Sequence, residues 1–217
     1  MKLFGWQKNS FKAFGVSVFR IRCKKGRLEY RIFNIPVWKR KTSLAALIEK
    51  VENNKSFDTH SLDADIESIV PAVADKAVRA PDAKRIAYLA TEFYDMGGHT
   101  KCVCEQVKCL ADVYTQQIFF TRLFAAFENA PKSMAELAKS TKIDGENVYL
   151  PNWKKTICGL FGKIIAFNPR VLFVYIHPND VFGAMILALL KHSADIKIIY
   201  CPHASHYPNL GIGFADI

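Results

Sequence analysis

Histidines and glycines gather in three short segments, and each segment follows an apolar run typical of a buried strand. The segments are residues 95–101, 177–180 and 203–206, and their candidate site residues are Gly97, Gly98, His99, His177, Asp180, His203 and His206. The pKa of a histidine lies near neutrality, so an imidazole can remove a proton from a hydroxyl group near pH 7. We interpret the three segments as the rim of a polar cleft in which an imidazole acts as a general base.

Each of these residues also has a simpler interpretation. Gly97 and Gly98 can let backbone N–H groups at a helix start approach a phosphate, or they can serve only as a turn. They do not form the Gly-x-Gly-x-x-Gly dinucleotide fingerprint. Asp180 is suited to cap the following helix, and each histidine can be a structural hydrogen-bonding group. As a set, the residues favour a polar cleft that supports catalysis.

The elements that must position these segments alternate between strand and helix from residue 84 onward. The expected strands are residues 86–91, 117–121, 147–150, 171–176 and 196–200, and the expected helices are residues 100–113, 131–140, 152–167 and 181–190. Such alternation predicts an α/β fold with a Rossmann-like parallel sheet flanked by helices. A strand order of 3-2-1-4-5 makes the first, fourth and fifth strands neighbours, so the three segments converge at the carboxyl edge of the sheet.

The front of the chain is strongly basic. Residues 1–41 contain 12 lysines or arginines and one acid, a net charge of +11, whereas residues 42–217 contain 18 bases and 19 acids, a net charge of −1. Aromatic residues are interspersed among these bases, and such a segment suits an anionic membrane surface as a partner. No nucleic-acid motif accompanies the charge, so we expect no nucleic-acid partner. The alternative is a β element that packs on the main body with its charges solvated.

The same basic segment contains an internal repeat. Residues 11–22 align with residues 30–41 at an offset of 19 positions, with Gly15 and Asn34 at equivalent turn-like places. Both copies alternate apolar and polar residues, which predicts short strands or hairpin arms. We therefore expect three parts: a basic β element at 1–41, a helical connector at 42–83 and a Rossmann-like domain at 84–217.

Two further features concern the compartment. Six cysteines, three of them crowded at Cys102, Cys104 and Cys109, lack a zinc-type spacing, so we expect buried free thiols and no metal. The sequence has no apolar run of about 18 residues and no secretory signal, so we expect a cytoplasmic protein, peripheral on the inner face of the cell membrane.

The marked segments resemble a family of bacterial glycosyltransferases with the GT-B fold. The resemblance is carried by the strand and Gly-Gly-His-Thr loop of residues 86–101, by residues 177–180, and by residues 203–216. The basic repeat is similar to segments that precede some surface-polysaccharide transferases. Ser205 stands where the family pattern has an acid, and Pro208 and Asn209 replace an aromatic pair.

The resemblance implies sugar transfer from a nucleotide-sugar, bound as substrate without a further cofactor, to a glycan or lipid-linked acceptor. From their places at the carboxyl edge of the sheet, we expect catalytic roles for His99 and His203, and substrate contacts for the other five candidates. At 217 residues the chain is short for two Rossmann-like domains of about 150 residues each, so we expect an acceptor-side domain, inactive alone, with a separate donor-binding domain as partner. Two alternatives are a non-catalytic glycan- or membrane-binding module and a metal-dependent hydrolase that uses His177, Asp180, His203 and His206.

Overall fold

The structure is a computed structural model. It describes residues 80–148, 153–202 and 209–217 in full. In the first part of the chain it describes only the backbone of five strands, at residues 4–7, 10–13, 16–24, 27–32 and 35–41. The helical connector expected at 42–83 lies almost entirely outside these ranges, so it stays a prediction.

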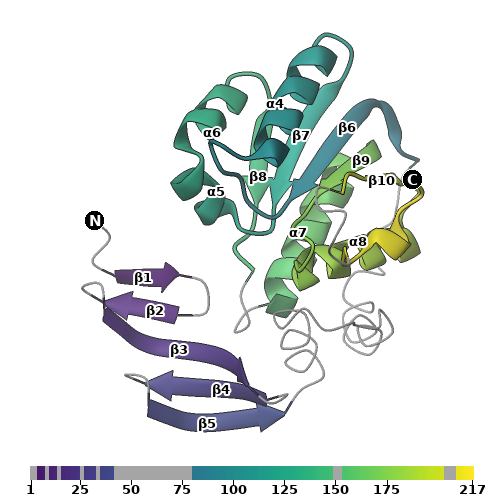
Figure 1. The fold of residues 1–217 in the computed structure, drawn as a ribbon. Helices are drawn as coiled ribbons and strands as arrows, with labels where there is room; N and C mark the ends of the chain where they lie inside the picture. Colours follow the sequence, from purple (N-terminus) through teal and green to yellow (C-terminus); the bar gives the residue numbers. More distant parts are fainter. Residues whose placement is uncertain are drawn as a thin grey trace. The chain divides into compact units, whose positions relative to one another are not determined.

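The first part of the chain forms an antiparallel sheet of five strands in sequential order (Figure 1). The strands are β1 (Phe4–Gln7), β2 (Ser10–Ala13), β3 (Val16–Lys24), β4 (Arg27–Ile32) and β5 (Ile35–Lys41). The two copies of the repeat occupy equivalent places in this sheet: the first covers parts of β2 and β3, and the second covers parts of β4 and β5. Each copy thus spans an antiparallel strand pair, in agreement with the expected hairpin arms.

The second part is a parallel sheet in the order β10-β9-β6-β7-β8. Its strands are β6 (Asp82–Ala90), β7 (Thr115–Phe120), β8 (Lys142–Gly145), β9 (Pro169–Tyr175) and β10 (Lys197–Tyr200). Counted along the chain, this is the order 3-2-1-4-5, which confirms the predicted Rossmann-like fold. The first and fourth strands, β6 and β9, lie side by side at the centre of the sheet.

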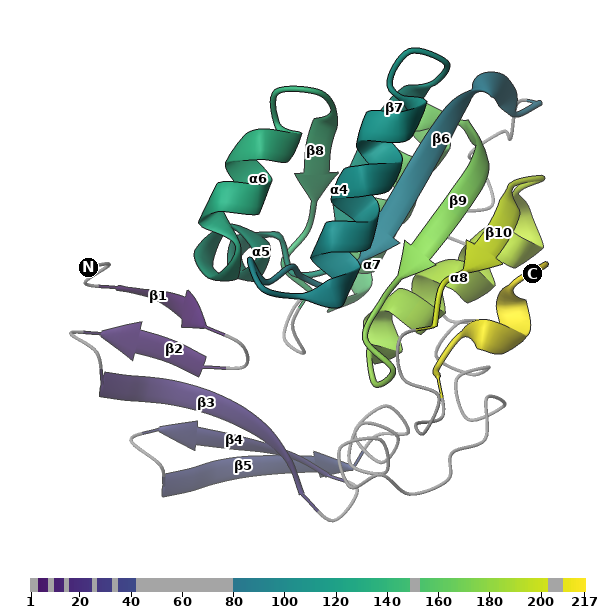
Figure 2. The same ribbon diagram turned by 45° about the horizontal axis from the view of Figure 1, so that its top comes forward.

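Helices cover both faces of this sheet. They are α4 (Gly98–Leu110), α5 (Leu123–Asn129), α6 (Pro131–Leu137), α7 (Trp153–Phe167) and α8 (Val181–Ser193), followed by the short 3-10 helix η2 (Ile212–Phe214). In Figures 1 and 2, α4 and α6 lie over one face and α7 and α8 over the other. The two-sided cover explains why residues 86–90 of β6 are buried without alternation.

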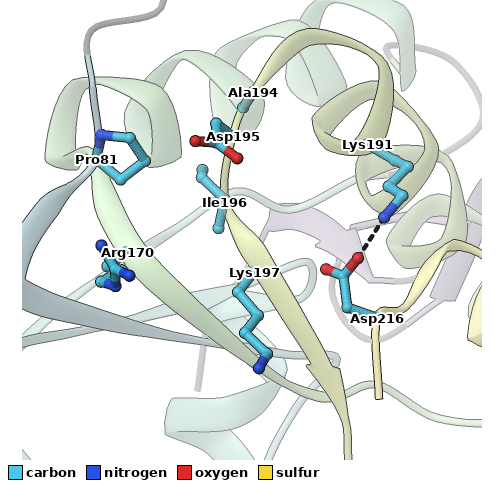
Figure 3. Close-up of a pocket in the computed structure, with 8 residues that line it drawn as sticks. All are labelled: Pro81, Arg170, Lys191, Ala194, Asp195, Ile196, Lys197 and Asp216. Atoms are coloured by element: carbon cyan, nitrogen blue, oxygen red, sulfur yellow. Dashed lines mark hydrogen bonds and ion pairs between the residues drawn. The ribbon is translucent and has the colours of Figure 1, made fainter.

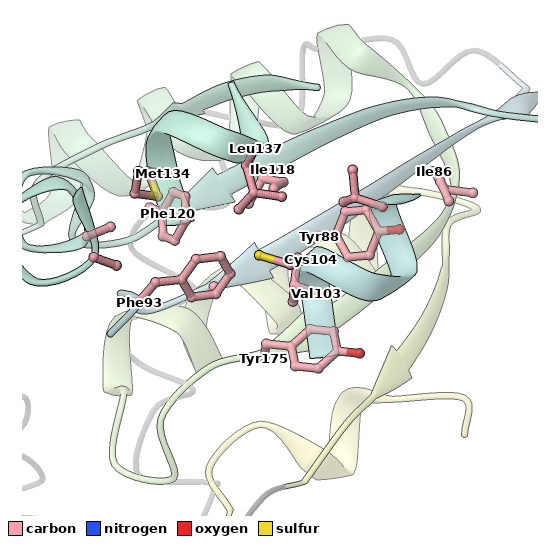
Figure 4. Packing of buried hydrophobic residues seen from close by; sticks show 14 residues of the cluster. Ile86, Tyr88, Phe93, Val103, Cys104, Ile118, Phe120, Met134, Leu137 and Tyr175 are labelled. Carbon is pink, nitrogen blue, oxygen red and sulfur yellow. The ribbon is translucent and has the colours of Figure 1, made fainter. Parts of the chain in front are cut away.

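Apolar residues of the strands and of α4 pack together in the core beneath this helix (Figure 4). Tyr88 of β6 and Phe120 of β7 meet Val103 and Val107 of α4, and all four residues are 0% exposed. Fully burying side chains of this size contributes about 1.5–3 kcal/mol each. The Tyr88 hydroxyl does not remain unpaired inside the core, because it donates to Gln116 Oε1 at 2.7 Å.

The apolar run of residues 181–190 is buried as a core helix. In α8 every residue from Gly183 to Leu190 is buried. Within the described ranges, no helix is long and apolar enough to cross a membrane.

Two expectations about local structure are wrong, and one helix was not expected. The third strand of the parallel sheet lies at Lys142–Gly145, before the expected residues 147–150, because a half-exposed edge strand tolerates the polar sequence Lys-Ile-Asp-Gly. Of the expected range, Asn147 forms an isolated bridge and Val148 belongs to no strand, and residues 149 and 150 lie outside the described residues. Helix α5 was not predicted, since Phe124 and Phe127 face outward and hide its helical pattern. Among the crowded cysteines only Cys104 is buried, and Cys102 and Cys109 are exposed.

Candidate functional site

The strands β6, β7 and β9 end level with one another. Ala90 pairs with Phe120 of β7 and with Tyr175 of β9. Since the strands are parallel, the segments after them leave the sheet at one shared edge. Ligands of open α/β sheets bind at this carboxyl edge, where the strand order switches direction. Here the switch lies at β6, so the loops after β6 and β9 are the place to search for a site.

A buried carboxylate ties these loops together. Asp180 is 2% exposed, and its Oδ2 accepts hydrogen bonds from the hydroxyls of Thr91 (2.6 Å) and Thr121 (2.7 Å). Its Oδ1 accepts from the Gly183 N–H at 3.0 Å, which caps α8. Asp180 therefore fixes the ends of β6 and β7 to the start of α8. Because these contacts lie inside the protein, the geometry supports a positioning role for Asp180.

A second carboxylate lies beside it. Glu92, two residues beyond β6, is 6% exposed. Arg122 Nη1 lies 3.2 Å from Glu92 Oε1, and Asn129 Nδ2 donates to Oε2 at 3.1 Å. A carboxylate is tolerated at such burial when a cation and hydrogen-bond donors compensate for the lost water.

His177 lies next to Glu92 at the start of the β9–α8 loop. Its N–H donates to Thr91 Oγ1 (2.8 Å) and its carbonyl accepts from the Asp180 N–H (2.9 Å), so its main chain is fixed on both sides. Its Nδ1 is 4.0 Å from Glu92 Oε1, and 25% of its side chain is exposed. Burial lowers the pKa of His177, and the charge of Arg122 lowers it further, while Asp180 and Glu92 act in the opposite direction. The imidazole is therefore neutral near pH 7 and can accept a proton.

His99 meets His177 from the other side of the edge. It is the second residue of α4, and the centroids of the two imidazoles are 6.2 Å apart. The His99 ring also meets Tyr175 edge-on at 5.9 Å. The structure thus brings together two of the candidate histidines that lie about 80 residues apart in the sequence.

Gly97 and Gly98 form the start of α4 beside these histidines. The Gly97 N–H donates to the Tyr94 carbonyl at 2.8 Å, and a Cβ on Gly97 would lie 3.1 Å from that oxygen. At Gly98 a Cβ would meet nothing within 4 Å. Within the described ranges no side chain caps this helix start and its first turn contains no acid. An anionic group can therefore approach the positive end of the helix dipole.

Tyr94 adds an aromatic surface to the site. Its ring stacks on that of His177, with centroids 6.2 Å apart and planes at 11°, and the residue is 45% exposed. Burial first, and then the charge and hydrogen bond of Glu92, raise the pKa of Tyr94. The phenol is thus neutral over the physiological range.

His203 and His206 lie outside the described residues, so their place in the site stays a prediction. Their segment follows β10, whose Tyr200 pairs with Val174 of β9, so it too begins at the carboxyl edge. Gly97, Gly98, His99, His177 and Asp180 are all found at this edge.

Sequence reasoning missed the residues that surround His177. They are Glu92, Tyr94 and Arg122, together with Asn129, which donates to Glu92. Glu92 could have been found from the sequence, because it is an acidic residue two positions beyond an apolar strand and at the same edge as the histidines. The partners Arg122 and Asn129 carry no such signal, because only the fold brings α5 to this loop.

A shallow hollow lies at the opposite, amino edge of the sheet (Figure 3). Its polar lining comes from Arg170, Lys191, Asp195, Lys197 and Asp216, with Lys191 and Asp216 forming an ion pair. None of the predicted site residues lines it. The charges of this hollow are partly neutralised within the hollow itself, and we regard the carboxyl edge as the candidate site.

Within the part of the chain that the structure describes, no three histidine, cysteine or acidic side chains are grouped closely enough to hold a metal ion. Comparisons with models of protein families, with curated proteins and with solved structures find no match to this chain.

Proposed function

We propose that residues 84–217 form the acceptor-side domain of a glycosyltransferase. In this function a sugar passes from a nucleotide-sugar to a hydroxyl group of a glycan or lipid-linked acceptor. The observation that carries the proposal is the pair His99 and His177, whose rings lie 6.2 Å apart at the carboxyl edge of β6 and β9. The class of substrate comes from the resemblance of the loop sequences to GT-B transferases.

The chemistry of the site fits an acceptor hydroxyl. A neutral imidazole can accept its proton, as the lowered pKa of His177 allows. The exposed ring of Tyr94 offers a flat apolar face for a sugar ring. The open start of α4 at Gly98 provides space and N–H groups for a phosphate.

The basic sheet β1–β5 extends the proposal to a membrane surface. The 12 lysines and arginines of residues 1–41 suit anionic lipid headgroups, where a lipid-linked acceptor would be found. This is the basis for proposing a peripheral position on the membrane.

Saccharide binding tests the proposed function directly. The full chain is applied to an array of glycans and lipid-linked saccharides, and the best ligand is titrated by calorimetry. We expect His99→Ala and His177→Ala each to weaken binding by about tenfold, the loss of one good hydrogen bond. His192→Ala, an exposed histidine at the end of α8, is the matched control and should bind like the wild type. The proposal is wrong if no saccharide binds, or if the three variants bind equally.

A further inference from the structure

Glu92 is a buried acidic residue of the candidate site, with partners on both of its side-chain oxygens. Its side chain is 7% exposed, against 38% for its partner Arg122. Both Glu92 oxygens have a partner, since Oε1 meets Arg122 and Oε2 accepts from Asn129. A core position of this kind needs no carboxylate for packing, and burying one costs free energy. The carboxylate is therefore placed for what it does to its neighbours.

The neighbour that Glu92 reaches is His177. Glu92 Oε1 lies 4.0 Å from Nδ1 of this imidazole, at the outer limit for an ion pair. A negative charge beside Nδ1 favours a proton on that nitrogen and leaves Nε2 with its lone pair. The ring of Tyr94 stacks on that of His177, with the ring centroids 6.2 Å apart. The imidazole is thus oriented by three features: its fixed main chain, the stacked ring and the carboxylate.

We propose that His177 accepts the proton of the acceptor hydroxyl and that Glu92 is its positioning residue. The inference rests on the proposed function and deepens it. It moves the role of base from His99 to His177, because the buried carboxylate lies beside His177. His99, across a gap of 6.2 Å between ring centroids, then contacts the bound acceptor.

The step conserves atoms and charge. The Nε2 lone pair of His177 takes the proton of the acceptor hydroxyl, and the electron pair of that O–H bond forms the bond to the anomeric carbon of the donor sugar. The bond from this carbon to the diphosphate oxygen breaks, and its electron pair leaves with the nucleotide diphosphate. The imidazolium is stabilised by Glu92 until its proton passes to solvent.

The charged residues around His177 allow the pairing of Glu92 with His177 to be tested, because two of them shift the pKa of His177 in opposite directions. From the β6–α4 loop it is faced by Glu92 and Tyr94, from the β7–α5 loop by Arg122, from α4 by His99, and from its own loop by Asp180. The carboxylate of Glu92 raises the pKa of His177 and the guanidinium of Arg122 lowers it, although burial remains the largest influence. Glu92→Gln should therefore lower this pKa further, and Arg122→Gln should raise it.

The experiment is a pH titration of the full chain by ¹⁵N NMR of the histidine side chains. In the wild type we expect His177 to be neutral at pH 7 with its proton on Nδ1. In Glu92→Gln the midpoint moves to lower pH and the share of the Nδ1–H tautomer falls. In Arg122→Gln the midpoint moves to higher pH. Glu128→Gln, which removes an exposed acid of α5, is the matched control and should leave both unchanged.

A disturbance of the fold would shift both variants in the same direction, so opposite shifts identify an electrostatic pair. The inference would be overturned if Glu92→Gln left the tautomer and the titration midpoint of His177 unchanged. It would also be overturned if the neutral imidazole of His177 in the wild type carried its proton on Nε2. The saccharide titration distinguishes failure of this inference from failure of the proposed function. If the wild type binds no saccharide, the proposed function fails, whereas the NMR result alone decides whether Glu92 acts on His177.

Discussion

Asp180 offers the sharpest test of how the site is held together. Its side chain receives hydrogen bonds from Thr91, Thr121 and Gly183, so one carboxylate links two strands and a helix. It also lies three residues from His177, whose carbonyl accepts from the Asp180 N–H. Asp180→Ala removes all three acceptor contacts and leaves the main chain otherwise unchanged.

The expected cost follows from these contacts. Loss of a helix N-cap costs about 1 kcal/mol. Two buried hydroxyls, those of Thr91 and Thr121, lose their acceptor, and each unpaired buried donor costs about 1–3 kcal/mol. We therefore expect Asp180→Ala to lower the free energy of unfolding by about 3–7 kcal/mol. Since domains are stable by only about 5–15 kcal/mol, this variant should be close to unfolding.

Urea unfolding of the full chain, followed by far-UV circular dichroism, measures this loss. Asp180→Asn separates the contributions, because asparagine caps helices about as well as aspartate but carries no charge. It should show an intermediate loss. Asp195→Ala, an exposed acid just beyond α8, is the control and should change stability by less than about 0.5 kcal/mol. A loss below about 1 kcal/mol for Asp180→Ala would refute the role assigned to this carboxylate.

Three further predictions concern other parts of the chain. Gly145→Ala should destabilise by at least about 2 kcal/mol in urea, because φ is +155° and a Cβ would lie 2.5 Å from a backbone oxygen of β7, whereas Gly213→Ala, with nothing within 4 Å, should be neutral. Lys163→Gln should cost about 1 kcal/mol at pH 7, by removing a bridge from α7 to Asp144 and Glu146. Burial raises the pKa of Asp144, but the hydrogen bond from Lys163 and other contacts lower it overall, so the bridge stabilises the protein at neutral pH. The difference in unfolding free energy between the wild type and Lys163→Gln should therefore shrink as the pH falls below 3.8, the ordinary pKa of an aspartate. A difference that does not change with pH would contradict the bridge. Co-sedimentation of the full chain should be stronger with anionic than with neutral vesicles and should weaken with salt, and equal, salt-insensitive binding would count against residues 1–41 as a membrane surface.

The sequence was sufficient for the order of the parallel sheet. Apolar runs alternating with helical spacing indicated a Rossmann-like parallel sheet, and the strand order 3-2-1-4-5 of such a sheet places β6 beside β9. The adjacency of His99 and His177 follows from that order, because His177 lies just beyond β9 and His99 starts the helix that follows β6. Asp180 was recognisable as a helix cap by its position before an apolar helix.

Other features depend on contacts that no local pattern records. The edge strand β8 is half exposed and polar, so its sequence resembles a loop. Arg122 and Asn129 belong to the start and end of a seven-residue helix that was not predicted, and their approach to Glu92 is tertiary. The environment of His177, and with it the direction of its pKa, could therefore be described only from the structure.

The central claim is that a saccharide binds at the carboxyl edge of β6 and β9. It is tested most directly by mapping the amide chemical shifts of the ¹⁵N-labelled full chain as the tightest-binding saccharide is added. Our account predicts that the largest changes occur at the amides of Gly98, His99 and His177. Changes concentrated at the amino edge, at Asp195 and Lys197, or no changes at all, would contradict it.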